Sequence, residues 1–322
     1  MKKKNFLVAG ILILIWLVVW LMTDVFGLIN PFQQVNIIWA GINVILAVSL
    51  NLVVGFTGQL ALGHAGFMAV GAYVSTVLTM NFGLPFPVAI LLGALAALVM
   101  GILIGLPTLR LRGDYLAIAT LGFGEIIRGL LVNIEYVGGA AGINGIPMKT
   151  NWTWVYLMAV ITIIIIRNMI TSRQGRACIT IRDDEVAAEL MGIDTTYYKT
   201  LAFSLGAFFA GVAGALYAHY FFMIQPATFA LQKSFDALVI VVLGGLGSIT
   251  GSVLAALGVT FMNAALIQLG AFRMVIYSLL LIAVMIFRPQ GLMGNKEFSL
   301  SVLDRVIPRK GGKGHAADKT DH

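Results

Sequence analysis

Long apolar stretches with almost no charge recur along the chain, separated by short polar segments. A helix needs about 20 such residues to cross a bilayer core of roughly 30 Å. Only 11% of the residues are charged, against about 25% in soluble domains, and 59% are hydrophobic. The pattern therefore predicts an all-α, polytopic integral membrane helical bundle of about ten transmembrane helices. We expect the spans at residues 6–22, 35–54, 61–80, 88–106, 115–131, 154–170, 201–222, 235–246, 253–269 and 274–287.

The basic residues predict how these spans are oriented. If ten spans cross in turn, all but four of the 21 Lys and Arg residues fall on the side of the amino terminus. The exceptions are Arg128, inside a span, and Lys149, Lys233 and Arg273, on the opposite side. Cytoplasmic segments carry this basic excess, so we expect both termini in the cytoplasm. The first span should be an uncleaved anchor, because "WLMTDVFG" offers no small-residue cleavage site.

The chain divides into a transmembrane domain, residues 1–294, and a tail, residues 295–322. The tail contains "RKGGKGHAADKTDH" and has little apolar surface to bury, so we expect it to be a disordered, basic, cytoplasmic segment. A single cysteine, Cys178, excludes an internal disulfide and a Cys-based metal site. Within the transmembrane domain, one crowded group of charges lies in a predicted cytoplasmic loop, residues 172–200.

This loop, residues 172–200, has a helix signal of its own. Thr180 and Asp183 have the spacing of a capping pair, and Gly192 is a natural helix stop. Between them, Val186, Leu190 and Ile193 fall on one helical face and form a narrow apolar ridge. The ridge either packs on the membrane ends of this chain or docks another protein. The residues that define the predicted helix are Arg182, Asp183, Glu185, Val186, Glu189, Leu190, Gly192 and Ile193.

Several segments resemble the LivM-type permeases, the membrane subunits of branched-chain amino acid ABC importers. They are "SRQGRACITIRDDEVAAELMGIDTTYYKTLAFSLGAFFAGVAGALYA", "SLNLVVGFTGQLALGHAGFMAVGAY", "GGAAGINGIP" and "GGLGSITGSVLAALG". The resemblance implies a type II ABC importer permease in the plasma (inner) membrane. It also implies four kinds of partner: a second homologous permease, two cytoplasmic ATP-binding subunits, an extracytoplasmic amino-acid-binding protein and the lipid bilayer. The loop at residues 172–200 would then be the ATPase-coupling segment.

The sequence does not favour an enzyme. No G-x-x-x-x-G-K-[ST] phosphate loop occurs, so ATP hydrolysis should belong to separate subunits. The sequence has neither an H-E-x-x-H nor a G-x-S-x-G motif. We therefore expect no catalytic residues, no metal and no cofactor on this chain, with ATP bound by the partners. The basic excess is explained by membrane orientation, so we expect no nucleic-acid binding.

Polar residues at membrane depth are costly and are candidates for a substrate pathway. Asn36, Asn43 and Asn51 share one face of the second span, and Glu125 and Arg128 lie three residues apart in the fifth. Hydrogen bonds between helices are the simpler explanation for the asparagines, and a structural ion pair for Glu125 and Arg128. The pathway candidates are Asn43, Asn51, Gln59, His64, Glu125 and Arg128.

Glycine and alanine are concentrated around Gln59 and His64, which favours either close helix packing or a broken helix whose backbone is buried in protein. The nearby "GFTGQLALGHAGF" is weakly similar to "GGLGSITGSVLAA" near the carboxyl end, as two related halves would be.

We interpret the chain as the permease subunit of an ATP-driven importer of branched-chain or other amino acids. Two alternatives remain open: an ABC permease for urea, short amides or another small polar solute, and a stand-alone secondary transporter driven by an ion gradient.

Overall fold

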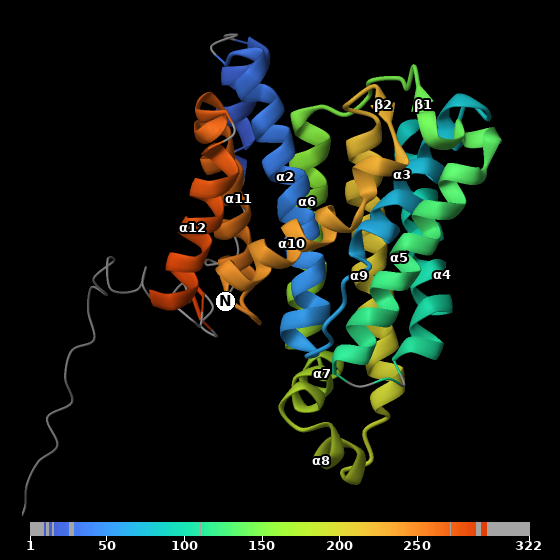
Figure 1. Ribbon diagram of the computed structural model, residues 1–322, viewed down its shortest axis with the longest axis vertical. Helices are drawn as coiled ribbons and strands as arrows, with labels where there is room; N and C mark the ends of the chain where they lie inside the picture. The colour runs from blue at the N-terminus through green and yellow to red at the C-terminus, as the bar shows by residue number, and fades with distance from the viewer. Residues whose placement is uncertain are drawn as a thin grey trace, which may run out of the picture.

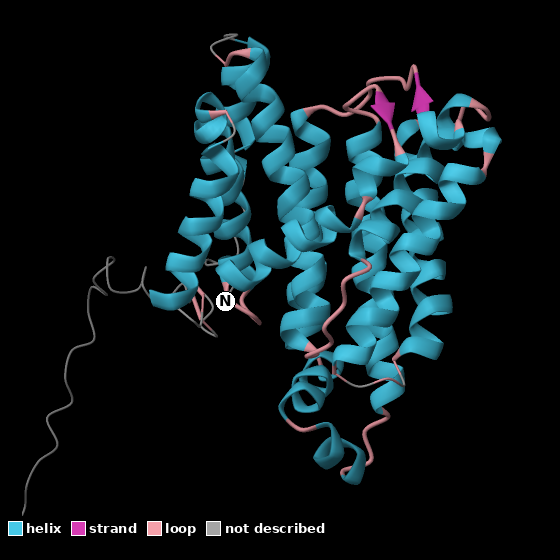
Figure 2. Cartoon of the chain, in the orientation of Figure 1, coloured by secondary structure: helices cyan, strands magenta, loops and turns pink. Residues whose placement is uncertain are grey.

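A computed structural model describes residues 10, 13–14, 16–25, 29–109, 111, 113–270, 272–287 and 291–294. Within these residues the chain is a bundle of helices with one short two-stranded sheet (Figures 1 and 2). Six helical stretches there are long and apolar enough to cross a membrane. They are Pro31–Phe56, Phe86–Thr108, Asp114–Asn133, Trp152–Thr171, Thr195–Ala218 and Pro226–Gly244.

The main helices follow the predicted spans closely in the first half of the chain and less closely in the second. They are α2 (Pro31–Asn51), α3 (His64–Met80), α4 (Phe86–Thr108), α5 (Asp114–Asn133), α6 (Trp152–Thr171), α7 (Arg173–Asp183), α8 (Glu185–Leu190), α9 (Thr195–Ala218), α10 (Leu231–Gly244), α11 (Ile249–Ala265) and α12 (Phe272–Phe287). Shorter turns are η1 (Leu21–Val25), η2 (Leu52–Phe56), η3 (Glu135–Val137), η4 (Gly139–Ala141), η5 (Pro226–Phe229) and η6 (Leu266–Leu269).

The polytopic helical class is confirmed, with one small addition. Strands β1 (Ile143–Asn144) and β2 (Met223–Ile224) pair antiparallel, with Ile143 opposite Ile224. Figure 1 shows this sheet at the end of the bundle opposite to α7 and α8. We call these two ends of the molecule the sheet end and the α8 end. The predicted span at residues 6–22 is only partly described, and the predicted tail at residues 295–322 lies outside the described residues.

Small residues allow α3, α4 and α9 to form the tightly packed centre of the bundle. A Cβ atom added at Gly71 of α3 would collide with the backbone of Gly211 in α9. Alanines at the same contacts, Ala94 and Ala97 in α4 and Ala210 in α9, are fully buried. Close backbone approach of this kind replaces the hydrophobic driving force that helices lack in lipid.

Two breaks interrupt the helices inside the bundle. Residues 57–63, between η2 and α3, have no regular structure, yet most of them are buried. Residues 245–248 form the turn between α10 and α11, and Figure 1 shows α10 crossing the bundle about midway between its two ends. Gly58 (φ 70°) and Gly247 (φ 83°) supply backbone conformations that other residues rarely adopt. The broken helix entry, one of the two alternatives for the segment before the third span, is therefore present.

Candidate functional site

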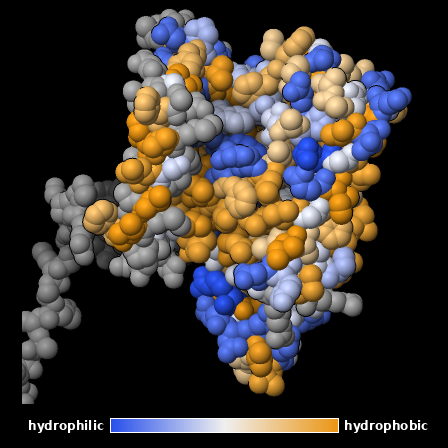
Figure 3. All heavy atoms as spheres, in the orientation of Figure 1, coloured by the Kyte–Doolittle hydropathy of each residue, from blue (hydrophilic) through white to orange (hydrophobic). Residues whose placement is uncertain are grey.

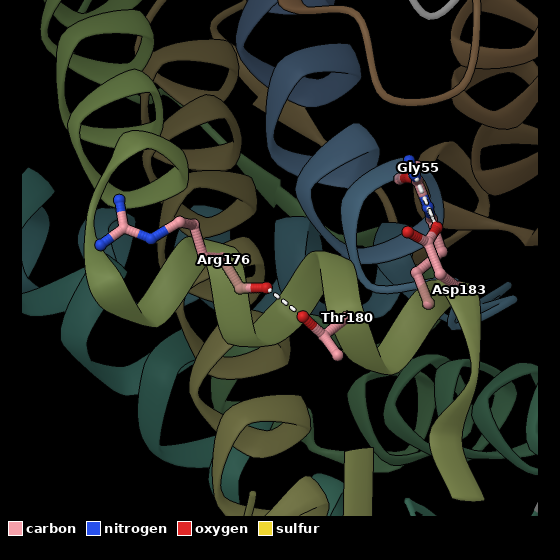
Figure 4. A network of polar contacts seen from close by, with 5 residues as sticks. Gly55, Arg176, Thr180 and Asp183 are labelled. Atoms are coloured by element: carbon pink, nitrogen blue, oxygen red, sulfur yellow. Dashed lines mark hydrogen bonds and ion pairs between the residues drawn. The ribbon is translucent and has the colours of Figure 1, made fainter. Parts of the chain in front are cut away.

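The loop at residues 172–200 folds into two helices, not one. Asp184 begins α8, because its Oδ1 accepts hydrogen bonds from the backbone N–H groups of Val186 (2.9 Å) and Ala187 (3.0 Å). The predicted capping pair of Thr180 and Asp183 is wrong. Thr180 lies inside α7, where its hydroxyl donates to the Arg176 carbonyl at 3.0 Å (Figure 4). A threonine can cap the start of a helix or donate its hydroxyl to a carbonyl inside one. Residue type and spacing alone therefore could not distinguish these two roles for Thr180.

The apolar ridge predicted at Val186, Leu190 and Ile193 is present in part. Val186 is 53% exposed and Leu190 is 84% exposed, whereas Ile193 is only partly exposed. Met191, which the sequence analysis missed, is 81% exposed at the carboxyl end of the helix. We call Val186, Leu190 and Met191 the α8 patch. In Figure 3 hydrophobic atoms lie at the extreme tip of the α8 end, below a mostly hydrophilic surface.

The acidic residues of α8 attach it to α9. Glu185 forms an ion pair with the buried Lys199 at 2.7 Å, and the Thr195 hydroxyl donates to Glu189 Oε1 at 3.0 Å. Ala188, on the same inner side, is fully buried. Asp194 fixes the start of α9 by accepting from the Tyr197 N–H at 3.0 Å. These contacts leave the α8 patch facing solvent while the charged residues bond inward.

Arg182, the last basic residue of α7, connects this loop to both breaks in the bundle. Its guanidinium pairs with Asp183 at 2.9 Å and donates through Nη1 to the Gly55 carbonyl at 3.2 Å (Figure 4). A Cβ atom at Gly58 would lie 3.0 Å from Arg182 Cγ, and one at Gly247 would lie 3.0 Å from Arg182 Nη1. The arginine therefore lies where the two similar glycine-rich segments meet.

Asn51 joins the same two segments from inside the bundle. Its Nδ2 donates to the Ser248 carbonyl (2.9 Å) and to Ser252 Oγ (2.7 Å), and its Oδ1 accepts from the Gly247 N–H (3.0 Å). The side chain is fully buried. All the polar atoms of Asn51 are thus used to bond α2 to the turn between α10 and α11.

The other asparagines of α2 differ in their surroundings. Asn43 is buried and donates to Thr260 Oγ1 of α11 at 3.0 Å, while its Oδ1 accepts from Lys233 Nζ at 3.1 Å. Asn36 is half-buried, and among the described residues its side chain bonds within its own helix, to the Phe32 carbonyl at 2.8 Å. The predicted interhelical hydrogen bonds are therefore confirmed for Asn43 and Asn51, but not for Asn36.

Gln59 and His64 flank the first break, as predicted, but their environments differ. His64 lies 2.9 Å from Ser49 Oγ of α2, a partner that the sequence pattern did not indicate. Gln59 is 2% exposed, and its amide has no hydrogen-bond partner among the residues that the structure describes. An unpaired buried amide is uncommon and costly, so Gln59 stays a candidate for contact with a solute or water.

Glu125 and Arg128 form the predicted ion pair, with Arg128 Nε 2.7 Å from Glu125 Oε2. About a third of each side chain is exposed, at 34% and 37% respectively. The pair is local to α5 and is not in contact with the asparagine cluster or with Gln59 in any described hydrogen bond.

Comparison with known proteins gives a family match that covers most of the chain. A protein-family profile described as "Branched-chain amino acid transport system / permease component" matches residues 35–288. The match includes both helix breaks and the loop that carries α7 and α8. No solved structure matches the chain.

Individual relatives agree with this profile. The high-affinity branched-chain amino acid transport system permease protein LivM of Salmonella typhimurium (strain LT2) is 37% identical over 287 residues, 78% of this chain and 68% of the relative. LivM of Escherichia coli (strain K12) is 36% identical over 327 residues, 91% of this chain and 75% of the relative. The LivH permease protein of Escherichia coli (strain K12) is 34% identical over 150 residues, 45% of this chain and 47% of the relative.

Proposed function

We propose, from the premise that the chain belongs to the family of branched-chain amino acid transport system permease components, that it is the transmembrane permease subunit of an ATP-driven ABC importer. Its cargo would be branched-chain amino acids, since the relatives' names state that transport. Its helices are long and apolar enough for a multi-pass membrane protein. The observation that carries the coupling role is the α8 patch, three apolar side chains more than half exposed at the tip of a polar surface.

The partners follow from this role. A second homologous permease would complete the translocation pathway, and an extracytoplasmic amino-acid-binding protein would deliver the solute at the sheet end. Two ATP-binding subunits would dock at the α8 end, which we place in the cytoplasm together with both termini. This orientation agrees with the basic excess on that side of the sequence, and the membrane would be the plasma (inner) membrane.

The contacts suggest how a movement of the ATPases would reach the membrane. A partner that binds the α8 patch would pull on α9 through Glu185 and Lys199. It would also shift α7, whose Arg182 donates a hydrogen bond to the Gly55 carbonyl in η2. Because the Arg182 side chain lies against Gly55, Gly58 and Gly247, a small displacement of α7 would act on both breaks directly. The pathway candidate closest in sequence to Gly58 is Gln59, whose side-chain amide has no described hydrogen-bond partner. His64 follows later in the same segment.

The decisive experiment places a charge in the α8 patch. Leu190→Asp, tested in vesicles with the second permease, the ATPases and the binding protein, should weaken ATPase retention or uncouple ATP hydrolysis from uptake. Interface anchors commonly cost more than ~1 kcal/mol when truncated, so retention should fall at least about fivefold. The permease itself should still fold, because Leu190 is 84% exposed.

Thr196→Asp is the matched control. It adds the same charge in the same loop at an exposed position outside the α8 patch, in the first turn of α9, where a negative charge is favourable. Normal retention and normal substrate-driven hydrolysis in Leu190→Asp would overturn the docking role of α8.

A further inference from the structure

A polar pocket lies on the side of the bundle away from the first break, between α2, α10, α11 and α12. Its volume is about 460 Å³, and its polar lining includes Asn36, Asn43, Lys233, Asp236 and Asn263. In Figure 3 hydrophilic side chains gather in the hollow between the α11–α12 side and the rest of the bundle, at the height of α10 in Figure 1. Ligand pockets typically measure about 300 to 1,000 Å³, so this one is large enough for a small solute.

Two opposite charges face this pocket from neighbouring positions of α10. Lys233 Nζ lies 3.1 Å from Asn43 Oδ1 and 4.0 Å from the centre of the Trp39 ring. Asp236, three residues later, is exposed toward the pocket. In the described part of the chain these two residues do not form a direct ion pair, because the ammonium group is directed to Asn43 and Trp39.

Lys233 lies outside the span predicted at residues 235–246, but α10 begins at Leu231 and Lys233 is a part-buried residue within it. It therefore belongs to the candidate membrane span Pro226–Gly244. A charge in such a segment is costly unless it is paired, solvated or used. Here a cation and an anion lie three residues apart on one wall, and Trp39, Ile240 and Val259 supply an apolar surface beside them.

We infer that this pocket is a subsite for a zwitterionic amino acid. Its carboxylate would pair with the Lys233 ammonium group, displacing the contact with Asn43, and its ammonium group would pair with Asp236. An aliphatic side chain would lie against Trp39 and Ile240. This inference rests on the proposed function, and it adds to that function a site whose charges match both ends of the cargo.

The test uses uptake of radiolabelled leucine by the complete complex in vesicles. Lys233→Gln and Asp236→Asn should each lower uptake about tenfold, since a hydrogen bond to a charged group contributes about 1.5–3 kcal/mol. Lys149→Gln is the control: it removes an exposed positive charge near the sheet end that does not line the pocket. Uptake equal to this control in both pocket variants would overturn the subsite while leaving the proposed function intact.

A second measurement does not depend on transport. Asn263→Cys, in a Cys178→Ser background, places a thiol on the pocket wall, and leucine should slow its reaction with a water-soluble thiol reagent several-fold. Lack of protection by leucine, or loss of the assembled complex in the charge variants, would identify the pocket as a contact surface for the second permease and overturn the subsite. Failure of the wild-type complex to take up leucine while leucine still protects this thiol would contradict the proposed function and support the subsite.

Discussion

The α8 end and the helix breaks distribute polar and apolar residues in opposite ways. At the breaks, Asn51 is buried and bonded between helices, to Gly247, Ser248 and Ser252, and Gln59 is buried without a described partner. At α8, the acidic Glu185 and Glu189 bond inward to α9, while Leu190 and Met191 extend into solvent.

The difference follows from the environment of each region, because the breaks are enclosed in the bundle and the α8 patch faces water. Inside the bundle no bulk water is present to pair with a backbone N–H or an amide, so each such group needs a protein partner. At the α8 end water can solvate any charge, and an exposed apolar patch there indicates a surface that another protein covers.

Asn51→Leu should have the largest effect. It removes the side-chain acceptor of the buried Gly247 N–H and one of the donors to the Ser248 carbonyl, which should lower the free energy of unfolding by about 3 kcal/mol. Thermal unfolding of the purified protein in detergent measures the loss. Asn36→Leu, which removes only a hydrogen bond described within α2 itself, should change it by less than ~1 kcal/mol. Equal effects of the two changes would break the contrast.

Cysteine labelling should separate the inner and outer surfaces of the α7–α8 loop. Cys178 is buried, and burial raises the pKa of its thiol to about 11. At pH 8 it should therefore react about 100-fold more slowly with an impermeant thiol reagent than the exposed thiol of Met191→Cys in a Cys178→Ser background. The thiol of Met191→Cys should react rapidly with the impermeant reagent in inside-out vesicles, and it should not react in right-side-out cells. Fast labelling from outside would reverse the proposed orientation.

Arg182→Gln should loosen the connection between the two regions without unfolding either. Losing the charged donor to the Gly55 carbonyl should lower uptake about fivefold while ATP hydrolysis continues. The control is Arg176→Gln on the same helix, since Arg176 is exposed and donates only to the Thr171 carbonyl at 3.4 Å. Similar uptake in both variants would rule out Arg182 as the connection.

Gln59→Leu should distinguish packing from transport. Because the buried amide has no described partner, removing it should raise the free energy of unfolding by about 1 kcal/mol. Uptake should nevertheless fall several-fold if Gln59 lines the pathway. His64→Leu should lower both quantities, because it breaks the contact with Ser49. A stabilised Gln59→Leu variant with unchanged uptake would remove Gln59 from the pathway.

Glu189→Ala should have the smallest effect. It loses one hydrogen bond from Thr195 at a solvated surface, which should contribute about 0.5 kcal/mol or less. Retention of the ATPases, measured as for Leu190→Asp, should stay close to that of the wild-type complex. A larger loss in Glu189→Ala than in Leu190→Asp would make the acidic residues, and not the α8 patch, the docking surface.

Features that depend only on residues close together in the chain were predictable from the sequence. The spans at 35–54, 88–106, 115–131 and 154–170 correspond to α2, α4, α5 and α6, because hydropathy and helix length are properties of a single segment. The pair of Glu125 and Arg128 followed from its spacing of three residues on one helix. The predicted cap at Thr180 was wrong because two local hydrogen-bonding patterns compete for the same hydroxyl.

From the sequence alone we predicted a helical membrane protein, Asn43 and Asn51 as pathway candidates on a polar face of the second span, and an apolar ridge that includes Leu190. Only the tertiary structure placed Arg182 at Gly55, 127 residues away, and Asn51 at Ser252, 201 residues away. It also placed Lys233 beside Asn43 and Trp39, and Met191 in solvent. The physical reason is that side-chain periodicity defines the face of one helix, whereas the partner of that face depends on how distant helices pack, and close packing here depends on glycines at their contacts.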